Sequence, residues 1–446
     1  MLMELITQAL DNWQVIIAAV IFLVCYALII SEKIDRSIIA LGGAVLMIIL
    51  GIVDLQVAYT EHIHWETLFL LLGMMILVGI AKESGIFQFI AIKTAQSAKG
   101  DPKRILVRLA ILTAVGSAFI DNVTMVLLIA PITISIANIM RIKPTPFLIT
   151  QILVCNIGGA ATLVGDPPNI MIGTAAGISF NQFLLHITPI ILIIAALTII
   201  YLRFHFSKQL KTDTEFRDKL LETDAKDYIR DSSLSKKSLI VFGLTLLGFL
   251  THQFLHLEPA VVALAGATVL MLIGTKNIGM EKVFHSVEWV TIFFFAGLFV
   301  LVGGLVDVGI IKQLATWLIE VTGNNVTLTS LVLLWGAGIA SAFVDNIPLV
   351  ATMIPLVHDM STQAALASGD AMTLWWSLAL GACLGGNGTL IASSANLIVA
   401  SVAAREGTPI SFVSFLKVSI PVTLATLGIA TVYVLVVFVA LGFAHV

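Results

Sequence analysis

Long apolar runs separated by short polar segments dominate the first half of the chain. In lipid, backbone polar groups must be satisfied within their own segment, and a helix needs about 20 apolar residues to cross a bilayer. Runs of this length therefore predict transmembrane helices. The predicted crossings lie near residues 14–31, 37–53, 65–83, 147–175 and 183–204. The segment 104–140 is long enough for two passes but is interrupted by polar residues at its centre, and we interpret it as a re-entrant hairpin.

The second half of the chain repeats the first. Residues 117–122 read Ser-Ala-Phe-Ile-Asp-Asn, and residues 341–346 read Ser-Ala-Phe-Val-Asp-Asn, a shift of 224 positions (117 to 341). The same shift relates Trp65 to Trp289, Gly73 to Gly297 and Pro131 to Pro355. Five crossings and one returning hairpin make an odd number of passes, so the second copy is predicted to be inserted upside down. Such inverted repeats are typical of secondary transporters.

The duplication divides the chain into three parts. The first repeat covers residues 1–204, with a hairpin at 104–140 and a broken helix at 147–175. A polar linker follows at 205–237. The second, inverted repeat covers 238–446, with a hairpin at 327–360 and a broken helix at 372–400. We therefore predict an all-α polytopic membrane protein with spanning helices, one re-entrant hairpin and one unwound helix in each repeat.

The composition supports a lipid-embedded protein. Hydrophobic residues make up 59% of the chain and charged residues only 11%, against about 25% charged residues in soluble domains; the mean hydropathy is +1.04. Alternation in blocks of about ten residues, the sign of an outer-membrane barrel, is absent from the sequence. The net charge of −3 gives no indication of a nucleic-acid partner. Three cysteines in apolar segments suit neither a disulfide framework nor a zinc site.

Lysine and arginine residues are concentrated on one side of the predicted topology. The linker and the segments flanking the first hairpin are basic, whereas the loops 54–64, 176–182 and 251–258 contain no Lys or Arg. Cytoplasmic loops of membrane proteins carry an excess of basic residues. We therefore predict a multi-pass protein of the cell (plasma or inner) membrane, with a cytoplasmic linker and both termini extracytoplasmic.

Four interruptions of the helical pattern carry the polar chemistry. Two are the hairpin tips, at Ser117–Thr124 and Ser341–Pro348, and two are glycine-rich stretches within spans, at Gly158–Asn169 and Gly385–Asn396. Irregular backbone at membrane depth is tolerated only where it lines a cavity or is buried in protein. An ionisable residue at this depth is usually functional. We therefore expect the four interruptions to meet at one polar site.

The acidic residues at these interruptions have two possible roles. Asp121 and Asp345 are placed to cap the half-helices that follow them, and Asp166 precedes two prolines that suit the first turn of a helix. Capping alone is an alternative to ligand binding, and it is strongest for Asp166. The candidate binding residues are Asp121, Asn122, Thr124, Gly159, Thr162, Asp166, Asn169, Asp345, Asn346, Gly386, Asn387, Thr389, Ser393 and Asn396.

No Lys or Arg lies near the four interruptions in the sequence. We therefore expect a site of carboxylates, amides, hydroxyls and helix dipoles, which favours a bound cation or proton. The hypothesis is that Asp121 and Asp345 carry the coupling H⁺ or Na⁺, with Asn122 and Asn346 as further Na⁺ ligands. No other cofactor is expected.

These four motifs resemble those of the ion transporter superfamily, in the branch of arsenite permeases (ArsB), NhaD-type antiporters and P-protein-like permeases. The stretch Gly165-Asp166-Pro167-Pro168-Asn169 is most similar to P-protein-like permeases. The resemblance implies a homodimer in which the hairpins and unwound spans move like an elevator against a scaffold. It also implies binding roles for Asp121, Asn122, Thr162, Asp166, Asn169, Asp345, Asn346, Thr389 and Asn396.

The expected function is secondary transport coupled to H⁺ or Na⁺, with the bilayer and a small ion or small molecule as partners. Neutral hydroxides such as arsenite or antimonite suit a site without basic residues. Na⁺/H⁺ antiport, cation-coupled transport of an anion or dicarboxylate, and a channel are alternatives. An intramembrane aspartyl protease is a remote one, because such enzymes place their two aspartates in dissimilar contexts, whereas Asp121 and Asp345 share one context. We therefore expect no enzyme.

Overall fold

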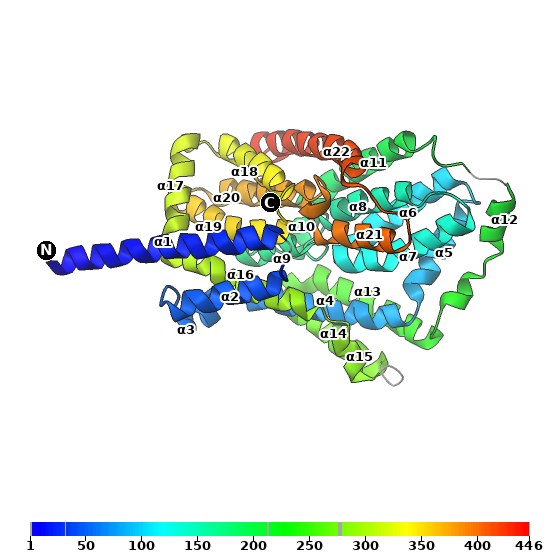
Figure 1. Cartoon of the computed structure of the whole chain (residues 1–446), viewed down its shortest axis with the longest axis horizontal. Helices are drawn as coiled ribbons and strands as arrows, with labels where there is room; N and C mark the ends of the chain where they lie inside the picture. Colours follow the sequence, from blue (N-terminus) through cyan, green and yellow to red (C-terminus); the bar gives the residue numbers. More distant parts are fainter. Residues whose placement is uncertain (1, 32, 212–213, 275–278, 446) are drawn as a thin grey trace.

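The computed structural model describes residues 2–31, 33–211, 214–274 and 279–445, and over these residues it contains helices and loops without strands (Figure 1). The predicted all-α class is therefore confirmed. Seven helical segments are long and apolar enough to cross a membrane. They are Trp13–Ser31, Trp65–Glu83, Asn122–Ile139, Thr188–His205, Ser232–Leu255, Trp289–Asp307 and Phe412–Ala440.

The duplicated sequence produces a duplicated order of helices. In the first half the helices are α1 (Leu2–Ser31), α2 (Arg36–Ile49), α3 (Leu55–Val57), α4 (Trp65–Glu83), α5 (Ile86–Ser97), α6 (Pro102–Ser117), α7 (Asn122–Ile139), α8 (Thr145–Gly159), α9 (Pro167–Ala176), α10 (Phe180–His186) and α11 (Thr188–His205). After α12 (Thr214–Glu222), the second half contains α13 (Ser232–Leu255), α14 (Pro259–Gly274), α15 (Met280–His285), α16 (Trp289–Asp307), α17 (Ile310–Thr322), α18 (Val326–Ser341), α19 (Asn346–Gln363), α20 (Ser368–Gly385), α21 (Ser394–Arg405) and α22 (Phe412–Tyr433).

The predicted hairpins and broken helices correspond to pairs of helices in the structure. The hairpins are α6–α7 and α18–α19, and the broken helices are α8–α9 and α20–α21. Their ends lie within a few residues of the predicted boundaries. Length alone does not separate a hairpin arm from a full crossing, since α7 also satisfies the criteria for a span. The re-entrant path and the inverted insertion of the second copy stay predictions.

One set of helices, which we call the framework helices, comprises α1, α2, α4, α13, α14 and α16. Within it α4 packs along α14, and α2 packs along α16. Both contacts depend on glycine: a Cβ on Gly73 would lie 2.8 Å from the carbonyl carbon of Ala263, and one on Gly297 would lie 2.6 Å from that of Ala40. Small residues of this kind let helix backbones approach closely in membranes.

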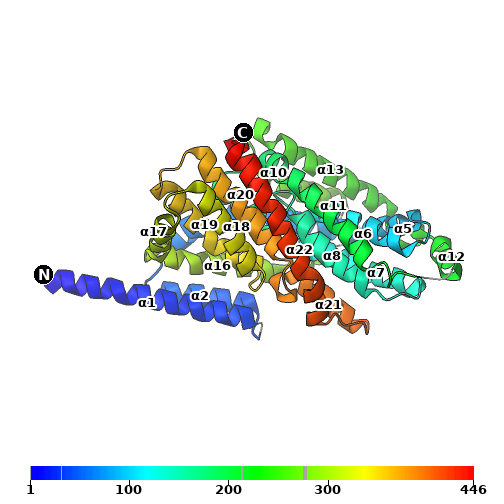
Figure 2. The ribbon, with the colours of Figure 1, turned by 90° about the horizontal axis from the view of Figure 1, so that it is seen from above.

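The second set, the hairpin helices, comprises α6–α9 and α18–α21. Within each copy α6 packs on α8, and α18 packs on α20. The copies also interlock, because α7 contacts α21 and α19 contacts α9. Figures 1 and 2 show α1 and α2 on one side of the molecule, away from α6, α7 and α8. The four predicted interruptions are therefore brought together where the two copies interlock.

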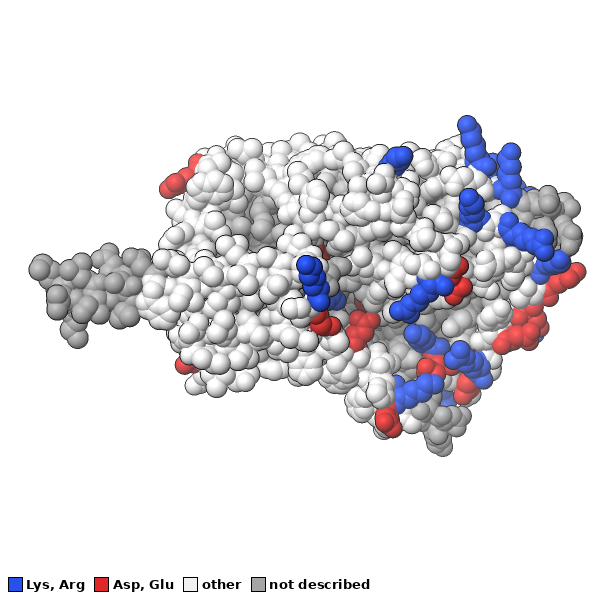
Figure 3. All heavy atoms as spheres, viewed as in Figure 1, with Lys and Arg blue, Asp and Glu red and all other residues white. Residues whose placement is uncertain are grey.

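The linker contains the short helix α12 at the end of the molecule opposite the N-terminus (Figure 1). The Nε2 of Gln96 on α5 donates to the carbonyl oxygens of Leu220 (3.2 Å) and Thr223 (2.6 Å), which fixes the linker to α5. Lys and Arg side chains gather at this same end (Figure 3). Helix α13 already begins at Ser232, inside the predicted linker. Residues 1 and 446, whose side of the membrane is predicted above, and linker residues 212–213 lie outside the described residues.

Candidate functional site

The two hairpin tips place an aspartate at the start of a helix. The Oδ1 of Asp121 accepts a hydrogen bond from the backbone N–H of Thr124 (2.9 Å) at the start of α7. The Oδ1 of Asp345 accepts one from the backbone N–H of Ile347 (3.1 Å) at the start of α19. The predicted capping by both aspartates is therefore confirmed. Each carboxylate retains its second oxygen for another partner.

Hydroxyl groups fasten each hairpin tip to the broken helix of the same copy. The four bonds are equivalent in the two copies, and each ends on a backbone carbonyl oxygen. They run from Ser117 to Cys155 (2.8 Å), from Ser341 to Ala382 (2.7 Å), from Thr162 to Ala118, and from Thr389 to Ala342 (2.7 Å). The predicted residues Thr162 and Thr389 thus use their hydroxyl protons inside the protein.

Two buried asparagines close the unwound stretches. The Nδ2 of Asn169 donates to the carbonyl oxygen of Thr162 (2.9 Å), and the Nδ2 of Asn396 donates to those of Thr389 (2.9 Å) and Gly386 (2.8 Å). Both side chains are fully buried. Their amide nitrogens therefore satisfy backbone carbonyls that the broken helices leave free. This geometry supports a structural role for these two candidates.

Asn156 on α8 joins the two copies, and the sequence prediction missed it. Its Nδ2 lies within hydrogen-bond distance of the Gly386 carbonyl (3.2 Å), the Asn387 Oδ1 (3.0 Å) and the Asn396 Oδ1 (2.9 Å). Cys383 corresponds to Asn156 in the second copy. Its Sγ lies 3.3 Å from the Oδ1 of Asn169, so this contact runs from the second copy to the first. The signal that could have revealed Asn156 is a polar residue in the otherwise apolar run that leads into the first glycine pair.

The glycines of the unwound stretches differ in how much space they have. A Cβ on Gly159 would lie 2.3 Å from the Oδ1 of Asn122, so only glycine fits beside this asparagine. A Cβ on Gly386 would find its nearest atom, the Cys383 carbonyl oxygen, at 3.3 Å. Gly159 therefore leaves room for the Asn122 side chain, whereas the position of Gly386 has more space for a side chain.

Asp166 occupies the N-cap position of α9, but its side chain makes no capping bond there. Instead, its Oδ2 accepts a hydrogen bond from the Nδ2 of Asn346 (3.1 Å), at the tip of the other copy's hairpin. The side chain of Asp166 is buried. Its counterpart Ser393 makes only a long contact of 3.4 Å to the Oδ1 of Asn156. Asp166 is thus a buried acid between the copies, not a simple cap.

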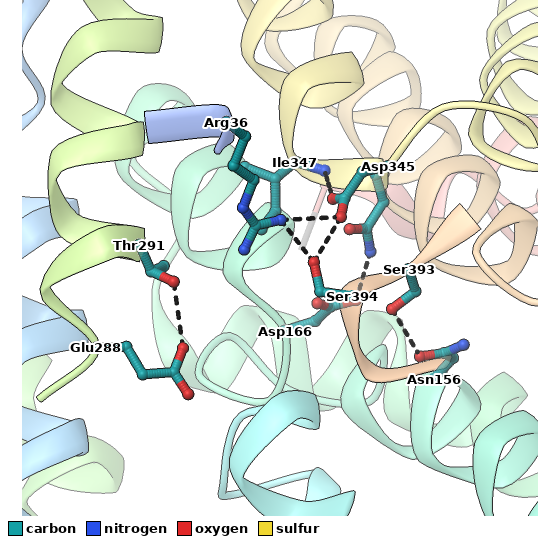
Figure 4. A network of polar contacts seen from close by, with 10 residues as sticks. Arg36, Asn156, Asp166, Glu288, Thr291, Asp345, Ile347, Ser393 and Ser394 are labelled. Carbon is teal, nitrogen blue, oxygen red and sulfur yellow. Dashed lines mark hydrogen bonds and ion pairs between the residues drawn. The ribbon is translucent and has the colours of Figure 1, made fainter. Parts of the chain in front are cut away.

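The expectation that the site lacks basic residues is wrong. Arg36, the first residue of α2, reaches the second hairpin tip, where its Nη1 lies 3.2 Å from the Oδ2 of Asp345 and 2.6 Å from the Oγ of Ser394 (Figure 4). The Ser394 hydroxyl in turn donates to the same Asp345 oxygen (2.7 Å). In the sequence Arg36 follows the first predicted span and is 309 positions from Asp345, and no local pattern connects the two.

Glu288, which precedes α16, is a fourth carboxyl group of the site, and it is contributed by the framework helices (Figure 4). Its Oε2 accepts a hydrogen bond from the Thr291 hydroxyl (3.2 Å). It also lies within electrostatic range of Asp121 and Arg36. Among the described residues, no group of three or more His, Cys, Asp or Glu side chains is arranged to hold a metal ion. A cation here would depend on amide, hydroxyl and backbone oxygens as well as carboxylates.

Two cavities separate the framework helices from α9. One, of about 340 Å³, lies between α16 and α19 and is bordered by Ala175, Phe299 and Ala351. The other, of about 290 Å³, lies beside α4 and is bordered by Leu70 and Thr174. Packing between the two sets of helices is therefore incomplete beside α16 and beside α4.

The geometry places the acids of both copies in one partly buried polar region. Comparison with known proteins shows the family to which the chain belongs. The sequence profile of the CitMHS family, described as "Citrate transporter", matches residues 26–381. The chain belongs to the CitMHS family. It is thus a member of a family of membrane transporters, which confirms the predicted resemblance to the ion transporter superfamily. The matched range includes both hairpins and the first unwound stretch.

Similar proteins match almost the whole length of the chain. The chain is 40% identical to the "46 kDa membrane protein" of Mycobacterium leprae, over 94% of this chain and 97% of the relative. It is 41% identical to an "Uncharacterized transporter" of Mycobacterium tuberculosis over the same shares. It is 31% identical to the human "P protein", over 96% of this chain and 60% of the P protein. The predicted similarity to P-protein-like permeases is therefore confirmed.

A solved structure supports the fold. The YdaH transporter of Alcanivorax borkumensis, reported to have an unusual topology, superposes with a TM-score of 0.58 at 14% sequence identity, and the alignment covers 98% of both chains. At this identity the likeness concerns the fold alone.

Proposed function

We propose that this CitMHS protein is a secondary active transporter that couples the movement of a small solute to H⁺ or Na⁺. The observation that carries the proposal is the buried contact between Asp166 of the first copy and Asn346 of the second. It brings an acid from one unwound stretch to the hairpin tip of the other copy. Sites of this kind, at the repeat interface and beside the N-termini of half-helices, are typical of secondary transporters.

The coupling cation is expected at Asp121 and Asp166. Within the described part of the chain, the ion pairs of Lys and Arg include neither of these carboxylates. A carboxylate away from water requires a cation, a proton or a dense set of donors. Asp345 differs, because Arg36 already neutralises it. We therefore revise the hypothesis that Asp121 and Asp345 carry the cation symmetrically, and place the coupling function mainly on Asp121 and Asp166.

The cargo is expected to be rich in oxygen atoms. Helices α7, α9, α19 and α21 all begin at the polar region, and helix N-termini carry partial positive charge that favours such groups. A neutral oxyacid of the arsenite or antimonite kind fits this environment. A carboxylate anion carried with cations is the second candidate. Two observations favour it: the family is described as citrate transporters, and Arg36 supplies a guanidinium at the second hairpin tip.

The mechanism we propose is of the elevator type, in which the hairpin helices move against the framework helices. Two observations support it. The cavities of about 340 and 290 Å³ lie between the two sets, and the sets otherwise pack mainly within themselves. We further propose a homodimer in the cell membrane, with the basic linker end (Figure 3) in the cytoplasm.

Reconstitution into liposomes tests the proposed function. Uptake of arsenite, Na⁺ and citrate is measured under imposed pH and Na⁺ gradients, for the wild type and for Asp121→Asn and Asp166→Asn. We expect saturable, gradient-driven uptake by the wild type and loss of gradient coupling in both variants. Asp218→Asn, on the exposed face of α12, is the control and keeps coupling. Flux that does not saturate, or full coupling in both site variants, contradicts the proposal.

A further inference from the structure

A salt bridge between Arg36 and Asp345 connects the framework helices to the hairpin helices. Arg36 begins the framework helix α2, whereas Asp345 caps α19 and Ser394 begins α21 of the hairpin set. The three side chains contact one another (Figure 4). The hydroxyl of Tyr26 on α1 adds a hydrogen bond to the carbonyl oxygen of Pro348 on α19. Movement of the second hairpin along α1 and α2 therefore requires these contacts to break.

The guanidinium of Arg36 is held in place by the framework side. Asp35 caps α2 by accepting from the backbone N–H of Ser37 (2.8 Å) and from its hydroxyl (2.6 Å). These bonds, led by that of the Ser37 side chain, hold the pKa of Asp35 below its usual range. The guanidinium carbon of Arg36 lies 4.9 Å from the ring centre of buried Phe294 on α16, a cation–π contact. Arg36 is therefore preoriented toward the position that Asp345 occupies.

The duplicated sequence does not duplicate this bridge. The position that corresponds to Arg36 in the second copy is Pro259, by the same shift that relates Ala40 to Ala263. The ion pairs found for Lys and Arg among the described residues do not include Asp121. The two aspartates therefore occupy the same position in the repeat but have different counter-ions. Asp345 has an internal one, Arg36, whereas Asp121 lies within electrostatic range of another acid, Glu288.

We propose that Arg36 is a resident cation that competes with Na⁺ or H⁺ for Asp345, and so couples occupancy of the site to release of the second hairpin from α2. The proposal rests on the proposed transport function. In the bridged state Arg36 neutralises Asp345. When one monovalent cation or proton occupies Asp345, the positive charge beside the carboxylate is conserved, and Arg36 is free to separate. Among the described residues, Arg36 contacts Asp345, Tyr26 and Asp166 lie within its electrostatic range, and Glu288 lies within that of Arg36.

The Arg36 side chain is 25% exposed and that of Asp345 is 16% exposed. At this exposure water screens the pair in part, so that the bridge is weak enough to break in each transport cycle. The carboxylate is still too buried to remain without any counter-charge. Competition between a tethered and a diffusible cation is therefore feasible at this position. Arg36 and the diffusible cation can therefore exchange at Asp345 during each cycle.

The first test measures cation binding to the purified full-length protein by thermal stabilisation, with NaCl against choline chloride at constant ionic strength, at pH 6.5 and 8.5. Arg36→Gln removes the competitor. We expect a half-saturating concentration of Na⁺, or of protons, at least five-fold lower than in the wild type. Adding Asp345→Asn should abolish this gain, and Arg36→Lys should restore most of the wild-type response. Arg405→Gln, an exposed position on α21, is the control. Equal cation responses in the wild type and Arg36→Gln overturn the proposal.

The second test measures release of the hairpin. Spin labels at exposed Ile49→Cys on α2 and Thr362→Cys on α19 report the distance between the two sets of helices by pulsed electron paramagnetic resonance. The native cysteines are buried and are protected from labelling. In choline, Arg36→Gln should shift the population away from the bridged distance, and NaCl or acid should do the same to the wild type. An unchanged distribution in Arg36→Gln overturns the proposal.

The outcomes separate this proposal from the proposed function. If the wild type shows gradient-driven uptake but Arg36→Gln has unaltered cation affinity, only the proposal that Arg36 competes with the cation is refuted. Competition without gradient-driven uptake defeats the transport proposal.

Discussion

Two glycines on packed helices of the second copy allow a test with opposite expected signs. Gly385 is the last residue of α20, and a Cβ there would lie 2.3 Å from the carbonyl oxygen of Gly338 and 2.8 Å from the Cβ of Ser341, both on α18. Gly336, also on α18, has no atom within 4 Å of the position that a Cβ would take. Substitution by alanine therefore overpacks one site and fills open space at the other.

The size of the effect follows from these distances. Ordinary contact begins near 3.4 Å, so α18 must retreat from α20 by about 1 Å to accept a methyl group on Gly385. The opposing atom is helix backbone and cannot rotate away. Overpacking of this kind costs about 1–3 kcal/mol, and the retreat weakens the bond from Ser341 to the Ala382 carbonyl (2.7 Å), worth about 1 kcal/mol. The higher helix propensity of alanine offsets about 0.8–1 kcal/mol of this loss in the free energy of unfolding.

We therefore expect Gly385→Ala to lower the free energy of unfolding by about 1–3 kcal/mol, and Gly336→Ala to raise it by up to about 1 kcal/mol. The assay is thermal or denaturant unfolding of the purified protein in detergent, with gradient-driven uptake in liposomes as a second readout. Displacement of the second hairpin tip should also reduce uptake by Gly385→Ala. The reasoning is refuted if Gly385→Ala is as stable and as active as Gly336→Ala.

Further predictions concern the polar contacts of the site. Asn156→Ala leaves the buried side-chain oxygens of Asn387 and Asn396 without this donor and should cost about 2–4 kcal/mol in the unfolding assay; Asn138→Ala, at an exposed end of α7, should cost less than about 0.5 kcal/mol. Equal stability of the two variants contradicts the role of Asn156 in joining the copies. Thr389→Val keeps the shape but removes the donor to Ala342, and should cost about 0.5–1.5 kcal/mol. An unchanged unfolding midpoint for Thr389→Val shows that this hydroxyl does not hold the hairpin tip.

Much of the local geometry of the site could be predicted from the sequence, because it depends on residues that are close in the chain. Asp121 and Asp345 cap helices whose first N–H groups lie two or three residues away. The glycine pairs and the Asp-Pro-Pro sequence locate the breaks for the same reason, since backbone freedom and the missing proline N–H act locally. The duplication then extends each prediction to the second copy.

Contacts between distant segments could not be predicted in this way. Asn156 is one of a few polar residues in a mostly apolar helix, and its partners Asn387 and Asn396 lie more than 200 positions away. Arg36 follows directly on the loop after the first span, where positive charge is ordinary in a cytoplasmic segment. Only the packing of α1 and α2 against the second hairpin brings it to Asp345. The expectation of a site without basic residues failed because it counted only neighbours in the sequence.

The contacts that occur in both copies differ in chemistry from those that occur in only one copy. The hydroxyl and amide bonds that hold tips to breaks, such as Thr162 and Thr389, occur in both copies and connect neutral groups. Asp121 and Asp345 recur, but the charged groups around them do not, since Asp166 corresponds to Ser393 and Arg36 to Pro259. A symmetric framework of neutral bonds can keep two half-sites in register at little electrostatic cost. An asymmetric set of charges makes the half-sites unequal, so that one carboxylate has an internal counter-ion and the others need one from solution. This inequality gives a diffusible cation a defined effect on a protein whose sequence is otherwise nearly repeated.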